Sequence, residues 1–333
     1  MDNNQEINFI PRPMPERSER IVKPLPKPKG GEKWIAILFF GSIILSILLW
    51  IGGNLANKSF SFNLKLPIGK TNIITPSPTL IPTQTTKIND ERETKILGLT
   101  SKLKGEYGVF TYNLTAKNSY AFNAGEIFTA ASLMKLPVIL TLYQEAEAGR
   151  LDLETKYLLQ QSDKRGGAGS LQSKPNGTTY TYRKLAEFMG QLSDNTAYAV
   201  LRRILGDQKI QQTIDNLGMN KTSLINDETT PEDMGLFFRK LYSGSIVTRE
   251  HRDEILSFLT DTAYEDRIPK GVPAGIKVAH KIGNEVNVIS DAGIVFASKP
   301  FVIVIMSEEI LEKEALETLP KITQIIWEFE TAN

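Results

Sequence analysis

Segments with the pattern of β-strands occur in two groups, one early and one late, separated by a long helical stretch. Strands from both groups can form one sheet only if the stretch between them folds as a lobe of its own. A cleft between such a lobe and the sheet is a natural binding site. The sequence therefore predicts an α+β domain. The five segments are Tyr107–Leu114, Ser119–Asn123, Ile276–Gly283, Asn287–Ala297 and Phe301–Ser307.

Helical spacing fills the stretch between the strand groups and also flanks them. A first helix is expected between Asp90 and Gly105, and a last one at Glu309–Glu330. The glycine-rich segment Lys164–Ser170 lacks the spacing of a phosphate-binding loop and is interpreted as a plain surface loop. The helices expected in the lobe are Leu133–Tyr143, Tyr182–Met189, Thr196–Leu205, Pro231–Leu241 and Arg249–Leu259.

The first helix of the lobe begins with Ser132 and Lys135, which lie one turn apart on the same face. A serine hydroxyl becomes a strong nucleophile when a neighbouring base takes its proton, and a lysine with a lowered pKa can be that base. Alone, the S-x-x-K pattern also fits an ordinary amphipathic helix. The chain holds a second copy, Ser101 and Lys104, which we expect at the surface in the last turn of the first helix.

Two further motifs follow in order. Ser193-Asp194-Asn195 lies at a break between two helices, where such residues often serve as N-caps. His280-Lys281-Ile282-Gly283 lies at the end of a strand, where a glycine turn would also be ordinary. Together, S-x-x-K, S-D-N and a K-x-G segment match the set found in class A β-lactamases and penicillin-binding proteins.

The chain from about residue 91 to 331 therefore resembles the class A β-lactamase-like serine hydrolases. Segments around the motifs are similar too, namely Thr229-Thr230-Pro231, Asp266-Arg267-Ile268-Pro269 and Asp291-Ala292-Gly293-Ile294-Val295. The resemblance implies a β-lactamase/transpeptidase-like fold. In it, a five-stranded antiparallel sheet is packed by the terminal helices and carries an inserted all-α lobe.

The resemblance also implies catalytic roles for four residues. Ser132 would be the acylated nucleophile, and Lys135 the base or part of the proton relay. Ser193 would pass a proton to the leaving nitrogen. Lys281 would hold Ser193 and add positive charge for the substrate's carboxylate.

Three further residues would bind the substrate. Asn195 would hydrogen-bond the substrate's amide and Lys135, and Gly283 belongs to the same binding edge. The backbone N–H groups of Ser132 and Asn284 would form the oxyanion hole. Asp194 would be structural. The implied substrate is a β-lactam or a peptidoglycan stem peptide.

Two departures from the family pattern stand out. Ile282 replaces the threonine of K-T-G, whose hydroxyl would help bind the substrate's carboxylate. The glutamate that activates the deacylating water is missing, because no glutamate lies between Asn195 and Asp227. Neither Asp227 nor Glu228 is expected to replace it. A D-Ala-D-Ala peptidase and a non-catalytic domain that binds cell wall or a partner protein therefore remain as alternatives.

The composition excludes several classes of site. The chain has no cysteine, so disulfides, thiolate metal sites and cysteine nucleophiles are absent. With only two histidines, a Ser-His-Asp triad is not expected. A formal net charge of +1 gives no reason to expect nucleic acid. We expect no metal and no cofactor, and a monomer.

The first ninety residues differ from the rest. Residues 1–33 are polar and proline-rich, and we expect a disordered cytoplasmic tail. Residues 34–51 carry no charge, and a helix of that length spans about 27 Å, close to the thickness of a bilayer core. Residues 52–90 read as a Thr/Pro-rich linker.

Basic residues flank the apolar segment mainly on its N-terminal side. The positive-inside rule then predicts a single-pass anchor in the cytoplasmic membrane, with the N-terminus inside and the domain at 91–333 outside. A cleaved signal peptide or a buried core helix would be the alternatives. Within the twenty positions before the segment lie six basic residues, namely Arg17, Arg20, Lys23, Lys27, Lys29 and Lys33.

Overall fold

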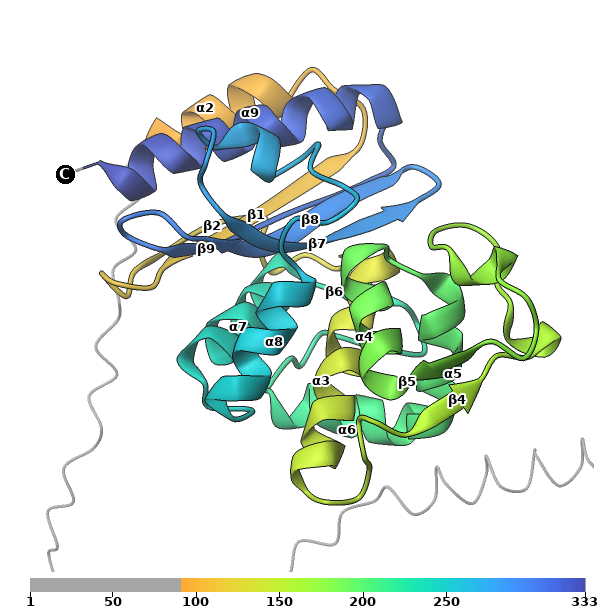
Figure 1. Ribbon diagram of the computed structural model, residues 1–333. Coiled ribbons are helices and arrows are strands. Elements are labelled where there is room, and N and C mark those ends of the chain that lie inside the picture. Colours follow the sequence, from red (N-terminus) through yellow and green to blue (C-terminus); the bar gives the residue numbers. More distant parts are fainter. Residues whose placement is uncertain (1–90, 333) are drawn as a thin grey trace, which may run out of the picture. The chain divides into compact units, whose positions relative to one another are not determined.

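The computed structural model describes residues 91–332, which form a five-stranded sheet with helices on both faces (Figure 1). The strand order is β2-β1-β9-β8-β7, and every neighbouring pair is antiparallel. The two strand groups of the sequence meet where β1 pairs with β9 along its full length. This confirms the predicted fold class. The strands are β1 (Glu106–Asn113), β2 (Ser119–Phe122), β7 (Val278–Glu285), β8 (Val288–Val295) and β9 (Phe301–Glu308).

The terminal helices α2 (Glu91–Thr100) and α9 (Glu312–Thr331) lie side by side on one face of the sheet (Figure 1). Their apolar sides pack on the sheet, and Ile96 and Ile322 are completely buried there. Helix α2 ends before Gly105, its expected end. Ser101 and Lys104 follow it and are exposed, so the second S-x-x-K is a surface pattern, as predicted.

The helical lobe covers the opposite face of the sheet (Figure 1). Helix α3 is its centre and contacts four other helices of the lobe, while α7 packs directly on β1 and β9. Pro231 occupies the first turn of α7, as expected, and the Thr230 hydroxyl caps that helix by accepting from Asp233 N. The helices are α3 (Lys135–Glu147), α4 (Tyr182–Gln191), α5 (Asn195–Leu205), α6 (Asp207–Asn216), α7 (Pro231–Ser243) and α8 (Arg249–Phe258).

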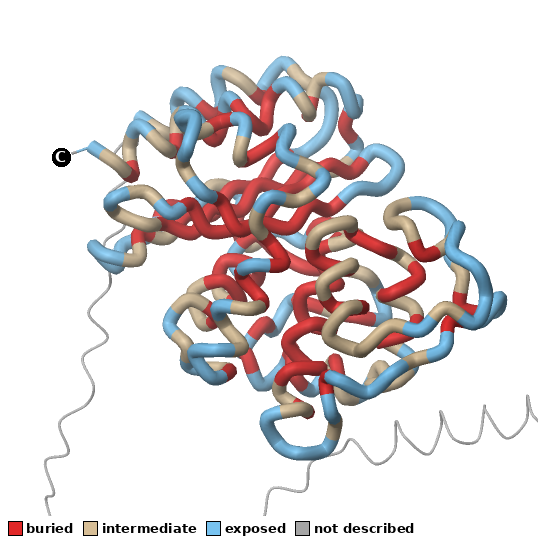
Figure 2. Tube along the Cα trace, in the orientation of Figure 1, coloured by how far each residue is buried: buried red, intermediate tan, exposed pale blue. Residues whose placement is uncertain are grey.

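Buried residues follow the sheet and the inner sides of the helices (Figure 2). The central strands β8 and β9 are buried on both faces, which explains the nearly continuous apolar run of β9. Two short ribbons complete the described part. They pair β3 (Phe128–Thr129) with β6 (Glu228–Thr229), and β4 (Lys156–Leu158) with β5 (Thr179–Thr181).

The predicted tail, membrane segment and linker at residues 1–90 lie outside the described residues. Within residues 91–332, no helix combines the length and the apolar character that crossing a membrane requires.

Candidate active site

Ser132 lies on a short 3-10 turn, Ala131–Met134, that leads directly into α3. Ala131 has a φ of 48°, a region in which non-glycine residues are strained by about 1–3 kcal/mol. A backbone hydrogen bond fixes the start of this turn, because Ala130 N donates to the carbonyl oxygen of Asp227 at 2.8 Å. This geometry presents the Ser132 hydroxyl at the N-terminal end of a buried helix, where developing negative charge is favoured.

The Lys135 ammonium nitrogen is surrounded by oxygens. Nζ lies 2.7 Å from Ser132 Oγ, 2.8 Å from Asn195 Oδ1, and 2.7 and 3.1 Å from the carbonyl oxygen and Oγ of Ser193. Burial lowers the pKa of Lys135 to about 8, although Asp194 and Asp227 act in the opposite direction. Because this pKa lies close to physiological pH, a minor fraction of Lys135 is neutral there and can take a proton from Ser132.

Ser193 connects this lysine to a second one. Lys281 Nζ donates to Ser193 Oγ at 2.9 Å and to the carbonyl oxygen of Ile282 at 3.1 Å. Burial and the charge of Lys135 hold the pKa of Lys281 well below its ordinary value. Ser193 itself has a φ of 52°. The serine hydroxyl thus stands between two lysines from opposite walls, in position to relay a proton.

The Ser193-Asp194-Asn195 break also fixes a neighbouring loop. The Asp194 carboxylate caps α5 by accepting from Ala197 N, and it accepts from the N–H groups of Ser170 and Leu171 at 2.7 and 2.9 Å. The structural role implied for Asp194 fits these contacts.

The interpretation of Lys164–Ser170 as a plain surface loop is wrong. Gly167 and Ala168 line the cleft beside Ser132, and Asn195 Nδ2 donates to the carbonyl oxygen of Gly166 at 2.9 Å. At Gly169, with a φ of 100°, an added Cβ would lie 2.2 Å from the Asp194 carboxylate. The glycines let this loop close over the S-D-N segment, a long-range contact that its composition alone did not indicate.

The binding edge is formed by β7. A Cβ at Gly283 would come within 2.9 Å of the Ala130 carbonyl oxygen, so glycine lets this strand approach the nucleophile turn closely. Asn284 follows and lines the cleft, while Ile282 is buried. The oxyanion hole formed by Ser132 N and Asn284 N stays a prediction.

The cleft between sheet and lobe has a volume of about 820 Å³ and contains Ser132, Lys135, Ser193, Asn195 and Asn284 in its wall. Among residues 91–332, no group of three His, Asp or Glu side chains is arranged to hold a metal ion.

Arg267 lines the cleft, but it was not assigned to the site from the sequence. The Asp266–Pro269 segment was named only as part of the resemblance. The Arg267 side chain is 4% exposed, and Nη2 donates to Asn284 Oδ1 at 2.8 Å. Within the described residues, its Nε and Nη1 make no hydrogen bond, and Nη1 lies 4.0 Å from Asp266 Oδ1. Arg267 is thus a buried guanidinium at the cleft wall with two buried donors that make no hydrogen bond.

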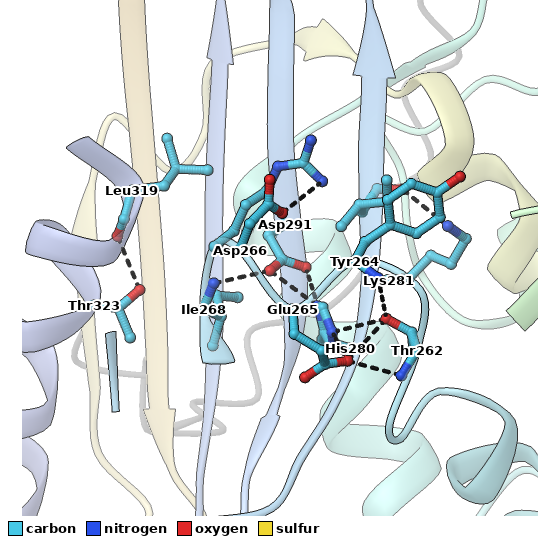
Figure 3. A network of polar contacts seen from close by, with 12 residues as sticks. Thr262, Tyr264, Glu265, Asp266, Ile268, His280, Lys281, Asp291, Leu319 and Thr323 are labelled. Atoms are coloured by element: carbon cyan, nitrogen blue, oxygen red, sulfur yellow. Dashed lines mark hydrogen bonds and ion pairs between the residues drawn. The ribbon is translucent and has the colours of Figure 1, made fainter. Parts of the chain in front are cut away.

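Behind Lys281, His280 forms a buried ion pair with Asp291 (Figure 3). The distances from His280 Nδ1 to the two carboxylate oxygens are 2.8 and 3.0 Å, and Asp291 also accepts from Ile268 N at 3.0 Å. Burial alone would lower the pKa of His280, but Asp291 and Glu265 raise it to about 9. The pair ties β7 and β8 to the loop that carries Arg267.

The match to known families decides the identity. A profile of the β-lactamase enzyme family matches residues 91–329. The chain belongs to the β-lactamase enzyme family. This membership supports a serine hydrolase enzyme, so the non-catalytic alternative is not retained.

Curated relatives agree with the family. The chain is 23% identical to the β-lactamase VEB-1 of Pseudomonas aeruginosa over 214 residues, which are 58% of this chain and 72% of that protein. It is 24% identical to a β-lactamase of Streptomyces albus G over 226 residues, 61% of this chain and 72% of that protein.

Solved structures agree in fold. The β-lactamase of Sphaerobacter thermophilus DSM 20745 superposes with a TM-score of 0.68 at 23% identity, over 72% of this chain and 96% of that one. A PBP-A mutant, solved as an acyl-enzyme complex with penicillin G, superposes with a TM-score of 0.69 at 23% identity, over 74% of this chain and 98% of that one.

Three aspartates follow Asn195 in this part of the β-lactamase-family chain, and of these only Asp227 lines the cleft. Asp207 pairs with Arg202, and Asp215 accepts from Gln211. Asp227 has a φ of 56° and is half-buried. Burial, followed by the charge of Glu285, raises the pKa of Asp227 to about 6.

Proposed function

We propose that this enzyme attacks a β-lactam or a peptidoglycan-type amide and forms an ester on Ser132. The observation that carries the proposal is the 2.7 Å contact between Lys135 Nζ and Ser132 Oγ, made by a lysine whose pKa is lowered to about 8. A buried lysine that is partly neutral and touches a serine hydroxyl has the properties of a general base.

The acylation step follows from these contacts. Lys135 takes the Ser132 proton while Oγ attacks the carbonyl carbon of the amide. The oxyanion would be held by Ser132 N and Asn284 N, a kind of contact typically worth about 3 kcal/mol. As the carbon–nitrogen bond breaks, the proton held by Lys135 passes through Ser193 Oγ, 3.1 Å away, to the leaving nitrogen.

The cleft also offers a place for a carboxylate next to the scissile bond. Lys281 and Ser193 supply a cation and a hydroxyl, whereas Ile282 supplies neither. We propose that the free donors of Arg267 take over the binding of this carboxylate. Both a penicillin and a peptide ending in D-Ala-D-Ala carry such a group, so a D-Ala-D-Ala peptidase reaction fits the same arrangement.

We further propose that the enzyme is anchored in the cytoplasmic membrane by residues 34–51 and acts outside. The uncharged segment and its basic N-terminal flank support this location. The linker at 52–90 would then separate the domain from the bilayer.

Intact mass spectrometry of the full chain with penicillin G tests the reaction. We expect one covalent adduct per chain, on Ser132, and none in Ser132→Ala. Ser101→Ala is the matched control from the surface S-x-x-K and should acylate like the unmodified protein. An adduct on Ser101, or one that survives Ser132→Ala, would contradict the assignment. Release of D-Ala from a peptide ending in D-Ala-D-Ala, measured in parallel, distinguishes the peptidase.

A further inference from the structure

The chain lacks the family glutamate for deacylation. Another carboxylate residue, Asp227, lies next to the turn that carries the nucleophile Ser132. β3 and β6 pair Thr129 with Glu228, so Asp227 lies one residue beyond this pair, opposite Ala130. Its carbonyl oxygen accepts from Ala130 N at 2.8 Å. The backbone therefore locks Asp227 next to the turn that carries Ser132.

The Asp227 side chain is surrounded by groups from four sides of the cleft. The Ala131 N–H, one residue before Ser132, stabilises its ionised form, as do Lys135 from α3 and Arg202 from α5. Glu285 at the end of β7 repels it. Tyr198 of α5 is also near enough for the two groups to affect each other's charge. The carboxylate thus shares its surroundings with the reacting serine and lysine.

The other carboxylates at the cleft stand in a different environment. Within the described residues, the cleft is also lined by Asp266, Glu285 and Glu312, and all three are exposed. Asp227 lines the same cleft but is half-buried, with a φ of 56°. A partly desolvated carboxylate next to a nucleophile is suited to take a proton from water.

We propose that Asp227 is the general base of deacylation, the second half of the reaction under "Proposed function", on which this inference rests. A water oxygen bonds to the acyl carbon while Asp227 accepts one water proton. Lys135, left neutral by acylation, accepts this proton from Asp227 through solvent and passes it to Ser132 Oγ, 2.7 Å away, as the bond from that carbon to Oγ breaks. Water is thus split into the released acid and the regenerated serine, and Asp227 and Lys135 return to their ionised and neutral forms.

The titration of Asp227 gives the step a pH signature. Burial and Glu285 raise its pKa to about 6, while the Ala131 N–H, Arg202 and Lys135 act against this shift. The base is ionised, and therefore active, above that pH. Deacylation should become faster as the pH rises through about 6.

The experiment loads the full chain with penicillin G, removes the free drug and follows loss of the adduct by intact mass. Asp227→Asn should acylate within about threefold of the unmodified protein and deacylate at least about a hundredfold more slowly, the range of a lost general base. Asp227→Glu keeps a carboxylate and should recover part of the rate. Asp215→Asn, at an exposed aspartate that does not line the cleft, is the control and should change neither rate. A melting curve checks that each variant is folded.

Each result decides the inference. Equal deacylation of Asp227→Asn and the unmodified protein overturns it, as does an adduct that never clears from the unmodified protein. If Asp227→Asn does not fold, the pH profile of the unmodified protein decides. A rise through pH 6 supports the role, and a flat profile contradicts it. Failure to form any adduct while penicillin G is also not consumed overturns the proposed function itself and with it the step assigned here.

Discussion

At the scale of single residues, the site depends on burial of charge. Lys135 and Lys281 are both almost fully buried, and Ser193 Oγ lies between their Nζ atoms. Burial lowers the pKa of both lysines, and the charge of Lys135 lowers that of Lys281 further. A lysine with a lowered pKa can act as a base near neutral pH. In the proposed reaction, one arrangement serves both the binding of an anionic substrate and its activation.

Lys135 should be required for acylation. Lys135→Ala removes the base, and Lys135→Arg should be nearly as damaging because a guanidinium cannot deprotonate. We expect both to lower the acylation rate by about a hundredfold or more, measured with a fluorescent penicillin. In the unmodified protein, the rate should rise with pH through about 8, where Lys135 becomes neutral.

Lys104→Arg, in the exposed S-x-x-K, is the matched control and should leave labelling unchanged. If Lys135→Arg kept most of the acylation rate, Lys135 would act only through its charge.

Arg267 should bind the substrate through its carboxylate. Arg267→Gln is expected to raise the apparent KM for penicillin G about tenfold to a hundredfold, the value of a hydrogen bond to a charged group. The methyl ester of penicillin G lacks this charge, so its KM should change little. Lys270→Gln, an exposed neighbour, is the control. An equal loss with acid and ester would show that Arg267 acts by shaping the cleft.

At the scale of elements, the His280–Asp291 pair joins three pieces that the site needs. It connects β7, which carries Lys281, with β8 and with the loop that carries Arg267 (Figure 3). Breaking one partner of a buried ion pair is strongly destabilising, because the other charge remains without compensation. His280 and Asp291 therefore fix the positions of Lys281 and Arg267, the two cations of the proposed carboxylate site.

This pair should give the fold a measurable pH dependence. The pKa of His280 is raised from 6.5 to about 9, so its contribution to stability is complete below pH 6.5 and is lost as the pH rises to 9. The difference in unfolding free energy between the unmodified protein and His280→Gln should shrink over this interval by about 3 kcal/mol. Denaturant unfolding at several pH values measures it. His251→Gln, at the other histidine, is the control, and a pH-independent difference would contradict the charged pair.

The same scale shows what a sequence can predict. The strands and the motif residues Ser132, Ser193 and Lys281 could be predicted because periodicity, turns and short motifs are local properties. Gly167 and Arg267 became parts of the site only through contacts with distant segments. Asp227 was named but not expected to replace the glutamate, because its place beside the nucleophile turn depends on the pairing of β3 with β6. Contacts between remote segments leave no local pattern in one sequence.

At the scale of the whole molecule, the proposed membrane anchor predicts on which side of the cytoplasmic membrane the domain lies. We predict that a reporter active only outside the cytoplasm is active when fused after Asn333. Deleting residues 34–51 should abolish that activity, while deletion of residues 71–82 from the linker serves as control and should not. Reporter activity that indicates a cytoplasmic C-terminus would overturn the proposed topology.

The pairing of β1 with β9 also has a consequence for synthesis. Glu106 lies opposite Glu308, so β1 and β9 can pair fully only after Glu308 has been synthesised. Contacts between segments so far apart form late and slowly, because the intervening chain must first be ordered. Until β7 takes its place in the sheet, Lys281 cannot donate its hydrogen bond to the Ser193 hydroxyl. A growing chain therefore lacks the complete site until β7, β8 and β9 have been synthesised and paired.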